Sequence, residues 1–158
     1  MPECDSMPDN IDLTILRHLQ ADATISYAAL GQAVGLSAGA THERVRKLRE
    51  AGVIIATTIR IDPLTVDLPV TAFVSVRAST WVGGHDVSQA LQAIPEIEEA
   101  HVTAGAASLL VKVRAASTTH LQRVLRQVFD IEGVSATESI IVLDTLFERS
   151  VAVPRTDD

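Results

Sequence analysis

Residues Ile25 to Ile54, reading ISYAALGQAVGLSAGATHERVRKLREAGVI, decide how the first part of this chain folds. They contain two short helical patterns joined by a tight turn at Val34-Gly35-Leu36-Ser37. Ser26 and Ser37 each stand where a hydroxyl can accept a hydrogen bond from a free amide of the first helical turn. Gly35 can take the left-handed conformation that ends a helix without steric cost. The stretch therefore predicts a helix-turn-helix.

The second helix of this pair has an inward and an outward face. Thr41, Val45 and Leu48 recur at i, i+4 and i+7, the spacing of a face that packs inward. Four cations fall within six residues of the same helix, which is typical of a helix that enters the major groove. A solvated charged face is the alternative, but the preceding capped helix and tight turn favour DNA contact. The predicted DNA-binding residues are Ser26, Ser37, Gly39, His42, Glu43, Arg44, Arg46 and Lys47.

The flanking segments extend this pair. Upstream, Asp9 can cap a further helix. The apolar stripe of that helix consists of Ile11, Ile15, Leu16 and Leu19. Downstream, Val53 to Ile61 is rich in β-branched residues and meets the turn signal Asp62-Pro63, so we predict a strand there. A strand in this place is typical of winged helix-turn-helix units. We expect a DNA-binding domain over residues 9–60 and a hinge linker over residues 61–69.

The formal net charge of −7 argues at first against a protein that contacts phosphates. The charge is unevenly distributed, however. Residues 9–60 carry six Lys or Arg against five Asp or Glu, a net of +1, and the remainder carries a net of −8. Such asymmetry is typical of a chain with a nucleic-acid-binding half. Because that half is only mildly basic, we expect several copies to act together.

Length and composition exclude several classes of protein. The 158 residues allow one domain or two small ones, and a hydrophobic content of 47% excludes a disordered chain. No apolar run approaches the roughly 18 residues of a membrane span, and residues 1–8 lack the pattern of a signal peptide. We therefore expect a cytoplasmic protein without a membrane partner. Cys4, the single cysteine, excludes a disulfide framework and a zinc site built on paired cysteines, and is expected to be an exposed thiol.

The second half of the chain alternates strand and helix signals. The expected strands are Val70 to Ala78, Ile97 to Val102, Ser108 to Val113 and a final strand within Val134 to Leu146. The expected helices begin at His85, after the break at Gly83-Gly84, and after the capping residue Ser117. The order β-α-β-β-α-β predicts a ferredoxin-like sheet with two helices on one face. The fold class is therefore α+β, a winged helix-turn-helix followed by a ferredoxin-like domain over residues 70–150.

The second face of this sheet has no remaining chain to cover it. Ile140 and Val142 belong to the apolar residues that this face would leave as an exposed patch. Burial against a second copy of the chain is the simplest solution.

These residues resemble the Lrp/AsnC (feast/famine) transcriptional regulators along nearly the whole chain. The landmarks are Asp9 and Asp12 before Ile15-Leu16, Leu36-Ser37, Arg44-Val45 with Leu48, Gly52-Val53-Ile54 and Asp62-Pro63. The resemblance implies a DNA-binding regulator that dimerises through its second domain and is often gathered into a ring of dimers. It also implies control by a small effector, usually an amino acid, bound between second domains.

One departure from the family concerns the effector loop. The family pattern Gly-x-x-Asp is Gly105-Ala106-Ala107-Ser108 in this chain. A serine accepts a hydrogen bond but offers no countercharge to an ammonium group. An amino-acid effector is therefore one interpretation, and a different ligand, no effector, or a small-residue turn packed at a subunit contact are the others. The candidate effector-binding residues are Thr103, Gly105, Ala106, Ala107, Ser108, Thr137 and Ser139.

The remaining residues suggest little other chemistry. None of the five histidines has the spacing of a metal ligand, so we expect no metal and no cofactor. His101 could serve a tetrapyrrole, because sirohaem decarboxylases resemble this architecture, and that enzyme is the competing hypothesis. An effector-independent DNA-organising protein is a further alternative. Trp81 is more typical of an interface anchor than of a cofactor platform.

Overall fold

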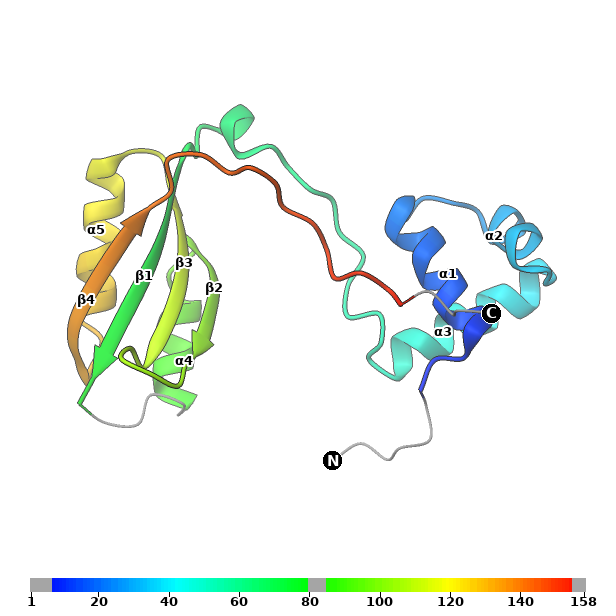
Figure 1. Ribbon diagram of the computed structural model, residues 1–158, viewed down its shortest axis with the longest axis horizontal. Coiled ribbons are helices and arrows are strands. Elements are labelled where there is room, and N and C mark those ends of the chain that lie inside the picture. The colour runs from blue at the N-terminus through cyan, green and yellow to red at the C-terminus, as the bar shows by residue number, and fades with distance from the viewer. Residues whose placement is uncertain (1–6, 80–84, 155–158) are drawn as a thin grey trace. The chain divides into compact units, whose positions relative to one another are not determined.

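The computed structural model of the protein describes residues 7–79 and 85–154. The chain forms two compact units (Figure 1). The first contains the chain up to Ile59 together with the segment that begins at Arg149, and the second runs from Arg60 to Glu148. The expectations for Cys4, Trp81 and Gly83-Gly84 lie outside the described residues.

The first unit is a three-helix bundle. Its helices are α1 (Asn10–Ala21), α2 (Tyr27–Val34) and α3 (Ala38–Glu50). Its fully buried apolar side chains are Ile15, Leu30 and Val45, together with the nearly buried Leu48. The predicted helix-turn-helix is confirmed.

The predicted caps form as the sequence indicates. Ser26 accepts from the amide of Ala29, and Ser37 from the amide of Ala40, each at 3.2 Å. Gly35 has a φ of 73° and ends α2 in the left-handed region. These contacts satisfy amides at the helix starts and fix the turn between α2 and α3.

Gly31 lies in the middle of α2, where a glycine costs about 1 kcal/mol relative to alanine. A Cβ atom at this position would lie 2.6 Å from the Leu36 carbonyl oxygen and 2.9 Å from Thr41 Oγ1. Thr41 itself is buried and donates to the Ser37 carbonyl at 2.9 Å. Gly31 therefore allows the turn and the first turn of α3 to approach α2 closely.

The predicted strand over Val53 to Ile61 is wrong. Residues 55–62 are without helix or strand, and Ile55 and Ile59 are largely exposed. β-branched residues favour a strand only when a second strand supplies the hydrogen bonds and a surface to pack against. The three-helix unit offers no such strand within the described residues, so the wing is not formed.

The second unit is a four-stranded antiparallel sheet with two helices on one face (Figure 1). The sheet order is β2-β3-β1-β4, which confirms the ferredoxin-like arrangement. In chain order the elements are a 3-10 turn (Pro63–Val66), β1 (Val70–Ala78), α4 (His85–Gln92), β2 (Ile97–Val102), β3 (Leu109–Ala115), α5 (Thr118–Phe129) and β4 (Val134–Ile141). The core lies between the sheet and the helices and is built by Val74, Val76, Val111, Val113, Leu121, Val124 and Val128 with their neighbours.

The strand β4 ends at Ile141 and lies within the predicted stretch Val134 to Leu146. The amide of Val142 still donates to the Thr71 carbonyl at 2.9 Å. Because β1 begins at Val70, it offers a longer β4 at most one further partner residue. The four residues that follow Val142 are exposed.

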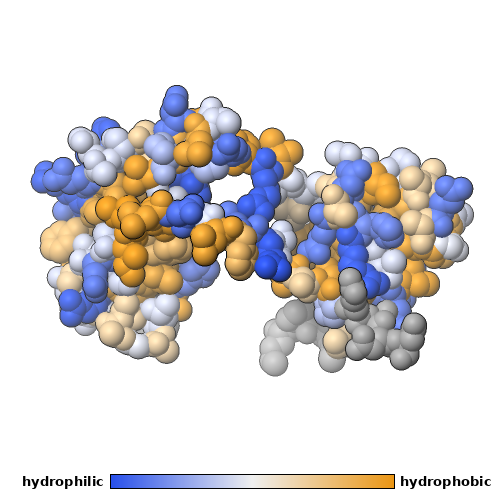
Figure 2. Space-filling view, turned by 45° about the horizontal axis from the view of Figure 1, so that its top comes forward, coloured by the Kyte–Doolittle hydropathy of each residue, from blue (hydrophilic) through white to orange (hydrophobic). Residues whose placement is uncertain are grey.

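The sheet face away from the helices carries apolar side chains at its β4 edge. Ile140 is 60% exposed, and Leu143, Leu146 and Phe147 in the segment after β4 are more exposed still. Figure 2 shows apolar side chains gathered on the sheet unit. This agrees with the expectation that the second unit leaves this face of its own sheet uncovered. Across residues 7–79 and 85–154, every helix falls short of what crossing a bilayer requires.

Candidate nucleic-acid interface

Helix α3 divides into two faces as its periodicity predicts. Thr41, Val45 and Leu48 are buried against the other helices. The predicted contact residues Gly39, His42, Arg46 and Lys47 are exposed, and Glu43 and Arg44 are partly exposed. The outward face of α3 is therefore exposed on the first unit.

Arg44 is directed toward α1. Its Nη1 atom lies 2.8 Å from a carboxylate oxygen of Asp9 and 2.8 Å from one of Asp12. These carboxylates raise the pKa of Arg44. The pKa of the Asp9 carboxyl is lowered, first by the amide of Asp12 and then by Arg44. Arg44 therefore joins α3 to the capping box at the start of α1, and its charge is compensated within the unit.

Arg46 lies on the outward face between two glutamates of its own helix. Its Nε and Nη2 atoms donate to the two carboxylate oxygens of Glu43 at 2.9 and 2.6 Å, and Nη1 donates to Glu50. The pKa of Arg46 is raised, first by Glu43, and the pKa of Glu43 is lowered, first by Arg46. The guanidinium thus faces solvent with its charge compensated.

Lys47 and Arg49 are the other two cations of α3. Lys47 takes part in none of the ion pairs found in the described part of the chain. Arg49 donates to the hydroxyl of Tyr27 at 3.4 Å. The Tyr27 ring also meets His42 edge-to-face, with ring centroids 4.9 Å apart and an interplanar angle of 88°. His42 and Arg49 are seven residues apart and lie on the side of α3 next to α2.

Sequence reasoning did not select Arg49 or Tyr27 for the interface. The seven-residue separation of His42 and Arg49 was an available signal, because it places both side chains on one side of a helix. The position of Tyr27 depended on how α2 crosses α3. The hydroxyls of Ser26 and Ser37 are exposed and act as caps, at the starts of the two helices.

The turn between β2 and β3 contains five of the candidate effector residues. Thr103 Oγ1 donates to the Ala107 carbonyl at 2.8 Å, and the Thr103 amide donates to the Ser108 carbonyl at 3.0 Å. Gly105 has a φ of 148°, while a Cβ there would meet no atom within 4 Å. Glycine is therefore needed at position 105 for the backbone conformation, and there is open space above the turn.

Ser108 has a local role in this turn. Its Oγ accepts from the amide of Ala78 at 3.2 Å, and its own amide donates to the Val76 carbonyl at 2.8 Å. The hydroxyl that replaces the acidic residue of the family pattern thus accepts a hydrogen bond from the amide of the last residue of β1. The turn and the β1 terminus are held together by these two bonds.

Thr137 and Ser139 lie one strand away from this turn. They pair with Val76 and Val74 of β1, and β1 separates β4 from β3. Paired residues of an antiparallel sheet point to the same face, so both side chains lie on the helix-covered side at its β4 edge. The structure brings the five turn residues together and leaves this pair across β1 from them.

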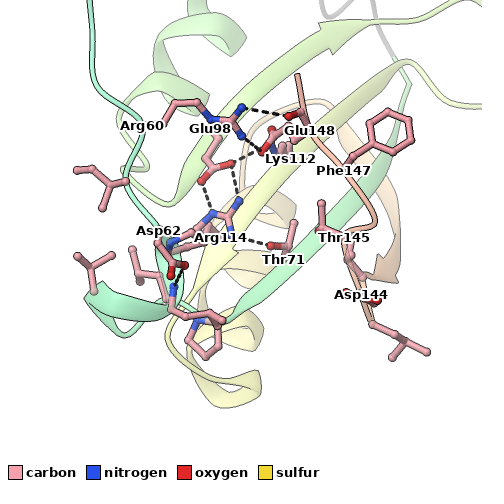
Figure 3. Close-up of a pocket in the computed structure, with 18 residues that line it drawn as sticks. Arg60, Asp62, Thr71, Glu98, Lys112, Arg114, Asp144, Thr145, Phe147 and Glu148 are labelled. Atoms are coloured by element: carbon pink, nitrogen blue, oxygen red, sulfur yellow. Dashed lines mark hydrogen bonds and ion pairs between the residues drawn. The ribbon is translucent and has the colours of Figure 1, made fainter. Parts of the chain in front are cut away.

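A second charged cluster lies on the open sheet face (Figure 3). Lys112 of β3 forms ion pairs with Glu98 at 3.2 Å, Glu99 at 3.3 Å and Glu148 at 3.0 Å. Burial lowers the pKa of Lys112, but the three glutamates outweigh it and the net pKa is raised. Arg114 pairs with Glu98 and donates to Thr71 at 2.9 Å.

The same cluster includes the first and last residues of the sheet unit, Arg60 and Glu148. Glu148 also pairs with Arg60 at 3.0 Å. The cluster borders an open cavity of about 730 Å³ that is lined by both apolar and charged side chains. Because each cation has a carboxylate partner, the geometry is that of a structural network.

The described residues contain no group of His, Cys, Asp or Glu that could hold a metal ion. His101 lies on β2, is exposed, and is 3.1 Å from a carboxylate oxygen of Glu99. His120 is paired with Glu96 at 2.8 Å, and its Nδ1 accepts from the Ala116 amide at 3.3 Å. The two histidines therefore have protein partners in separate parts of the second unit.

Comparison with protein families matches both units. Residues 9–49 match the AsnC-type helix-turn-helix domain, and residues 71–152 match the Lrp/AsnC ligand binding domain. The second match alone covers more than half of the chain.

Individual relatives agree. The chain is 31% identical over 144 residues to the regulatory protein AsnC of Escherichia coli, covering 90% of this chain and 95% of that protein. It is 35% identical over 137 residues to the HTH-type transcriptional regulator FL11 of Pyrococcus horikoshii, covering 87% and 90%. A solved feast or famine regulatory protein from M. tuberculosis, complexed with L-methionine, superposes with a TM-score of 0.86 at 31% identity, covering 94% and 100%.

Proposed function

The chain belongs to the Lrp/AsnC family of transcriptional regulators, and from this premise we propose how its own residues bind DNA and an effector. The observation that carries the proposal is the capped α2–turn–α3 unit with an exposed outward face on α3. The relatives named above are regulators, which favours regulation over the tetrapyrrole-processing enzyme.

Helix α3 enters the major groove. Lys47 and Arg46 contact phosphates or guanine edges, and His42 and Glu43 are placed for base edges. Gly39 allows the backbone to come close to the DNA, and Ser26 and Ser37 lie near the phosphate backbone at the two helix starts. Arg44 was also predicted to contact DNA; its pairing with Asp9 and Asp12 supports a positioning role for it instead.

The DNA proposal is tested by fluorescence anisotropy with the duplex upstream of the protein's own gene. Arg46→Ala/Lys47→Ala is expected to weaken binding at least tenfold and to flatten its salt dependence, because up to two phosphate contacts are lost. The matched control is Arg123→Ala/Arg126→Ala, which removes two exposed cations from α5 of the other unit. Equal affinities of the double variant and wild type would overturn the assignment.

The effector is a free amino acid bound at the turn between β2 and β3. The related M. tuberculosis protein, whose structure is described as a complex with L-methionine, supports this class of ligand. The open space above Gly105 and the hydroxyls of Thr103 and Ser108 support this place. Thr137 and Ser139 contribute from across β1, and a neighbouring subunit completes the site.

A thermal-shift screen of the twenty amino acids identifies the effector, because a ligand that binds only the folded state raises its melting temperature. Gly105→Glu and Thr137→Ala should then each abolish that shift while DNA binding persists. A shift that survives in both variants at wild-type concentrations would exclude this site.

The protein forms a dimer through the open face of its sheet, with rings of dimers as the larger assembly, and acts in the cytoplasm. The support is the exposed apolar surface that includes Ile140 and Leu143. Sedimentation should give dimers or multiples of dimers for wild type, and monomers for Ile140→Asp. Because Ile140 is already 60% exposed, this variant should keep the monomer folded. A monomeric wild type would contradict the proposal.

A further inference from the structure

The outward face of α3 places one arginine between two glutamates. Arg46 donates to both oxygens of Glu43 and, on the other side, to Glu50. The spacings are i, i+3 and i, i+4, and the three side chains are 46–59% exposed. The cluster therefore presents one negative charge in excess to whatever approaches this face.

The other cations of α3 outweigh this excess by only one charge. Arg44 is compensated by Asp9 and Asp12. Of the four cations of α3, Lys47 and Arg49 take part in none of the ion pairs formed by residues 7–79 and 85–154. A helix with four cations in its sequence thus offers two uncompensated ones to phosphate.

This arrangement bears on the two components of DNA binding. Non-specific affinity comes from cations that replace counterions on phosphates, so a compensated arginine contributes little to it. A carboxylate next to DNA is tolerated only where a hydrogen-bond donor faces it. Among the base edges of the major groove, the cytosine N4 amino group is the donor that glutamate commonly contacts. At other sequences the carboxylates meet phosphate or a carbonyl edge and repel it.

We propose that Glu43 and Glu50 are specificity-determining residues, which compensate Arg46 and so suppress binding to DNA that lacks matching base-edge donors. The inference rests on the proposed function of α3. Glu50 lies one helical turn beyond the predicted contact residues and acts together with Glu43 through the shared arginine. On a matching site, Glu43 turns to a base-edge donor and Arg46 is released to the DNA.

A purely structural role of the same pairs gives a different outcome. Exposed i, i+3 and i, i+4 pairs support a helix slightly, and their loss would change helix stability and both kinds of DNA binding together. The specificity role changes the ratio between the affinities for matched and unmatched DNA.

The experiment compares wild type with Glu43→Gln/Glu50→Gln on two duplexes, the region upstream of the protein's own gene and a scrambled duplex of equal composition. The variant should bind the scrambled duplex about tenfold more tightly, with a salt slope steeper by about one, because one further phosphate contact becomes available. Affinity for the upstream duplex should fall or rise by less than that, because the amide oxygen introduced by Glu43→Gln accepts from the base-edge donor more weakly than the carboxylate does. The specificity ratio therefore falls.

Two controls separate charge from position. Asp130→Asn/Glu132→Gln removes two exposed carboxylates from the other unit and should leave both affinities unchanged. Glu43→Asp/Glu50→Asp keeps the charges and should retain at least part of the discrimination. Thermal unfolding of each variant checks that α3 remains folded.

The outcomes are distinct. If wild type itself does not prefer the upstream duplex, the proposed function fails. If wild type prefers the upstream duplex and Glu43→Gln/Glu50→Gln has the same ratio of the two affinities, the specificity role alone is overturned. The same conclusion follows if that ratio equals the one of the Asp130→Asn/Glu132→Gln control.

Discussion

The two units use the same pairing of arginine or lysine with glutamate in opposite settings. On α3, Arg46 and its partners are each 46–59% exposed and belong to one helix. On β3, the side chains of Lys112 and Arg114 are only 12% and 17% exposed, and their partners come from β2 and the segment after β4. Exposed pairs of near neighbours are worth little and exchange readily, whereas enclosed pairs are costly to break. The first arrangement suits a binding surface and the second a structural lock.

The largest effect is expected where the enclosed network loses its centre. Lys112→Met would leave Glu98, Glu99 and Glu148 without their shared cation. The three carboxylates are 33–51% exposed and keep other partners, so we expect the sheet unit to lose about 1–3 kcal/mol of stability. Chemical denaturation followed by hydrogen exchange in peptides of each unit measures this. The control Lys47→Met, on the exposed face of α3, should leave the stability of its own unit unchanged. Equal effects of the two variants would remove the contrast between the units.

The pH dependence of the same network has a defined sign. Lys112 lowers the pKa of Glu148 below its ordinary value of 4.5, and His101 and then Lys112 lower that of Glu99. A carboxylate whose pKa is lower in the folded state stabilises the fold above its unfolded pKa, and this contribution is lost as the pH falls through the folded value. Wild type should therefore lose sheet-unit stability below about pH 4.5, and Lys112→Met should lose less. If the sheet units of the two proteins lose equal free energy of unfolding between pH 6 and pH 3, this prediction is contradicted.

The first unit is expected to depend on close packing at Gly31. Gly31→Ala gains helix propensity but drives a methyl group against the Leu36 carbonyl, and overpacking of this kind costs about 1–3 kcal/mol. Hydrogen exchange should show faster opening of α2 and α3 and no change in the sheet unit. Gly39→Ala, where the added Cβ meets nothing within 4 Å, should instead stabilise α3.

A smaller effect should separate the two arginines of α3. Arg44→Met breaks the link to Asp9 and Asp12 and should cost about 0.5–1 kcal/mol of first-unit stability, since the pairs are partly exposed. Arg46→Met should leave the unfolding midpoint unchanged and weaken DNA binding. If Arg46→Met destabilises the unit as much as Arg44→Met, the pairs on α3 are structural after all.

Local signals in the sequence predicted the elements whose contacts are local. Ser26, Ser37 and Gly35 act within one turn of their own helix, so spacing alone identified them. The sheet order followed from the sequence of strands and helices. The strand predicted over Val53 to Ile61 did not form, because the described residues of the first unit offer it no partner strand.

In the candidate sites too, features set by local spacing were predicted, and features set by distant residues were not. The outward face of α3 follows from helical periodicity, whereas the compensation of Arg44 depends on carboxylates 35 and 32 residues away. The turn around Gly105 was found through the family pattern. The distance of Thr137 from that turn depends on the strand register, in which Thr137 pairs with Val76 of β1. The order of strands and helices does not give that register.

The most direct test of sequence-specific binding by α3 is selection of bound duplexes from a pool of random DNA. Wild type should enrich a motif made of two half-sites related by two-fold symmetry and spaced by about 10–10.5 base pairs or a multiple, as expected for paired helix-turn-helix units. Arg46→Ala/Lys47→Ala should enrich none. A bound pool with the composition of the starting pool, or the same motif enriched by that variant, would contradict the assignment of α3 as the DNA-contacting helix.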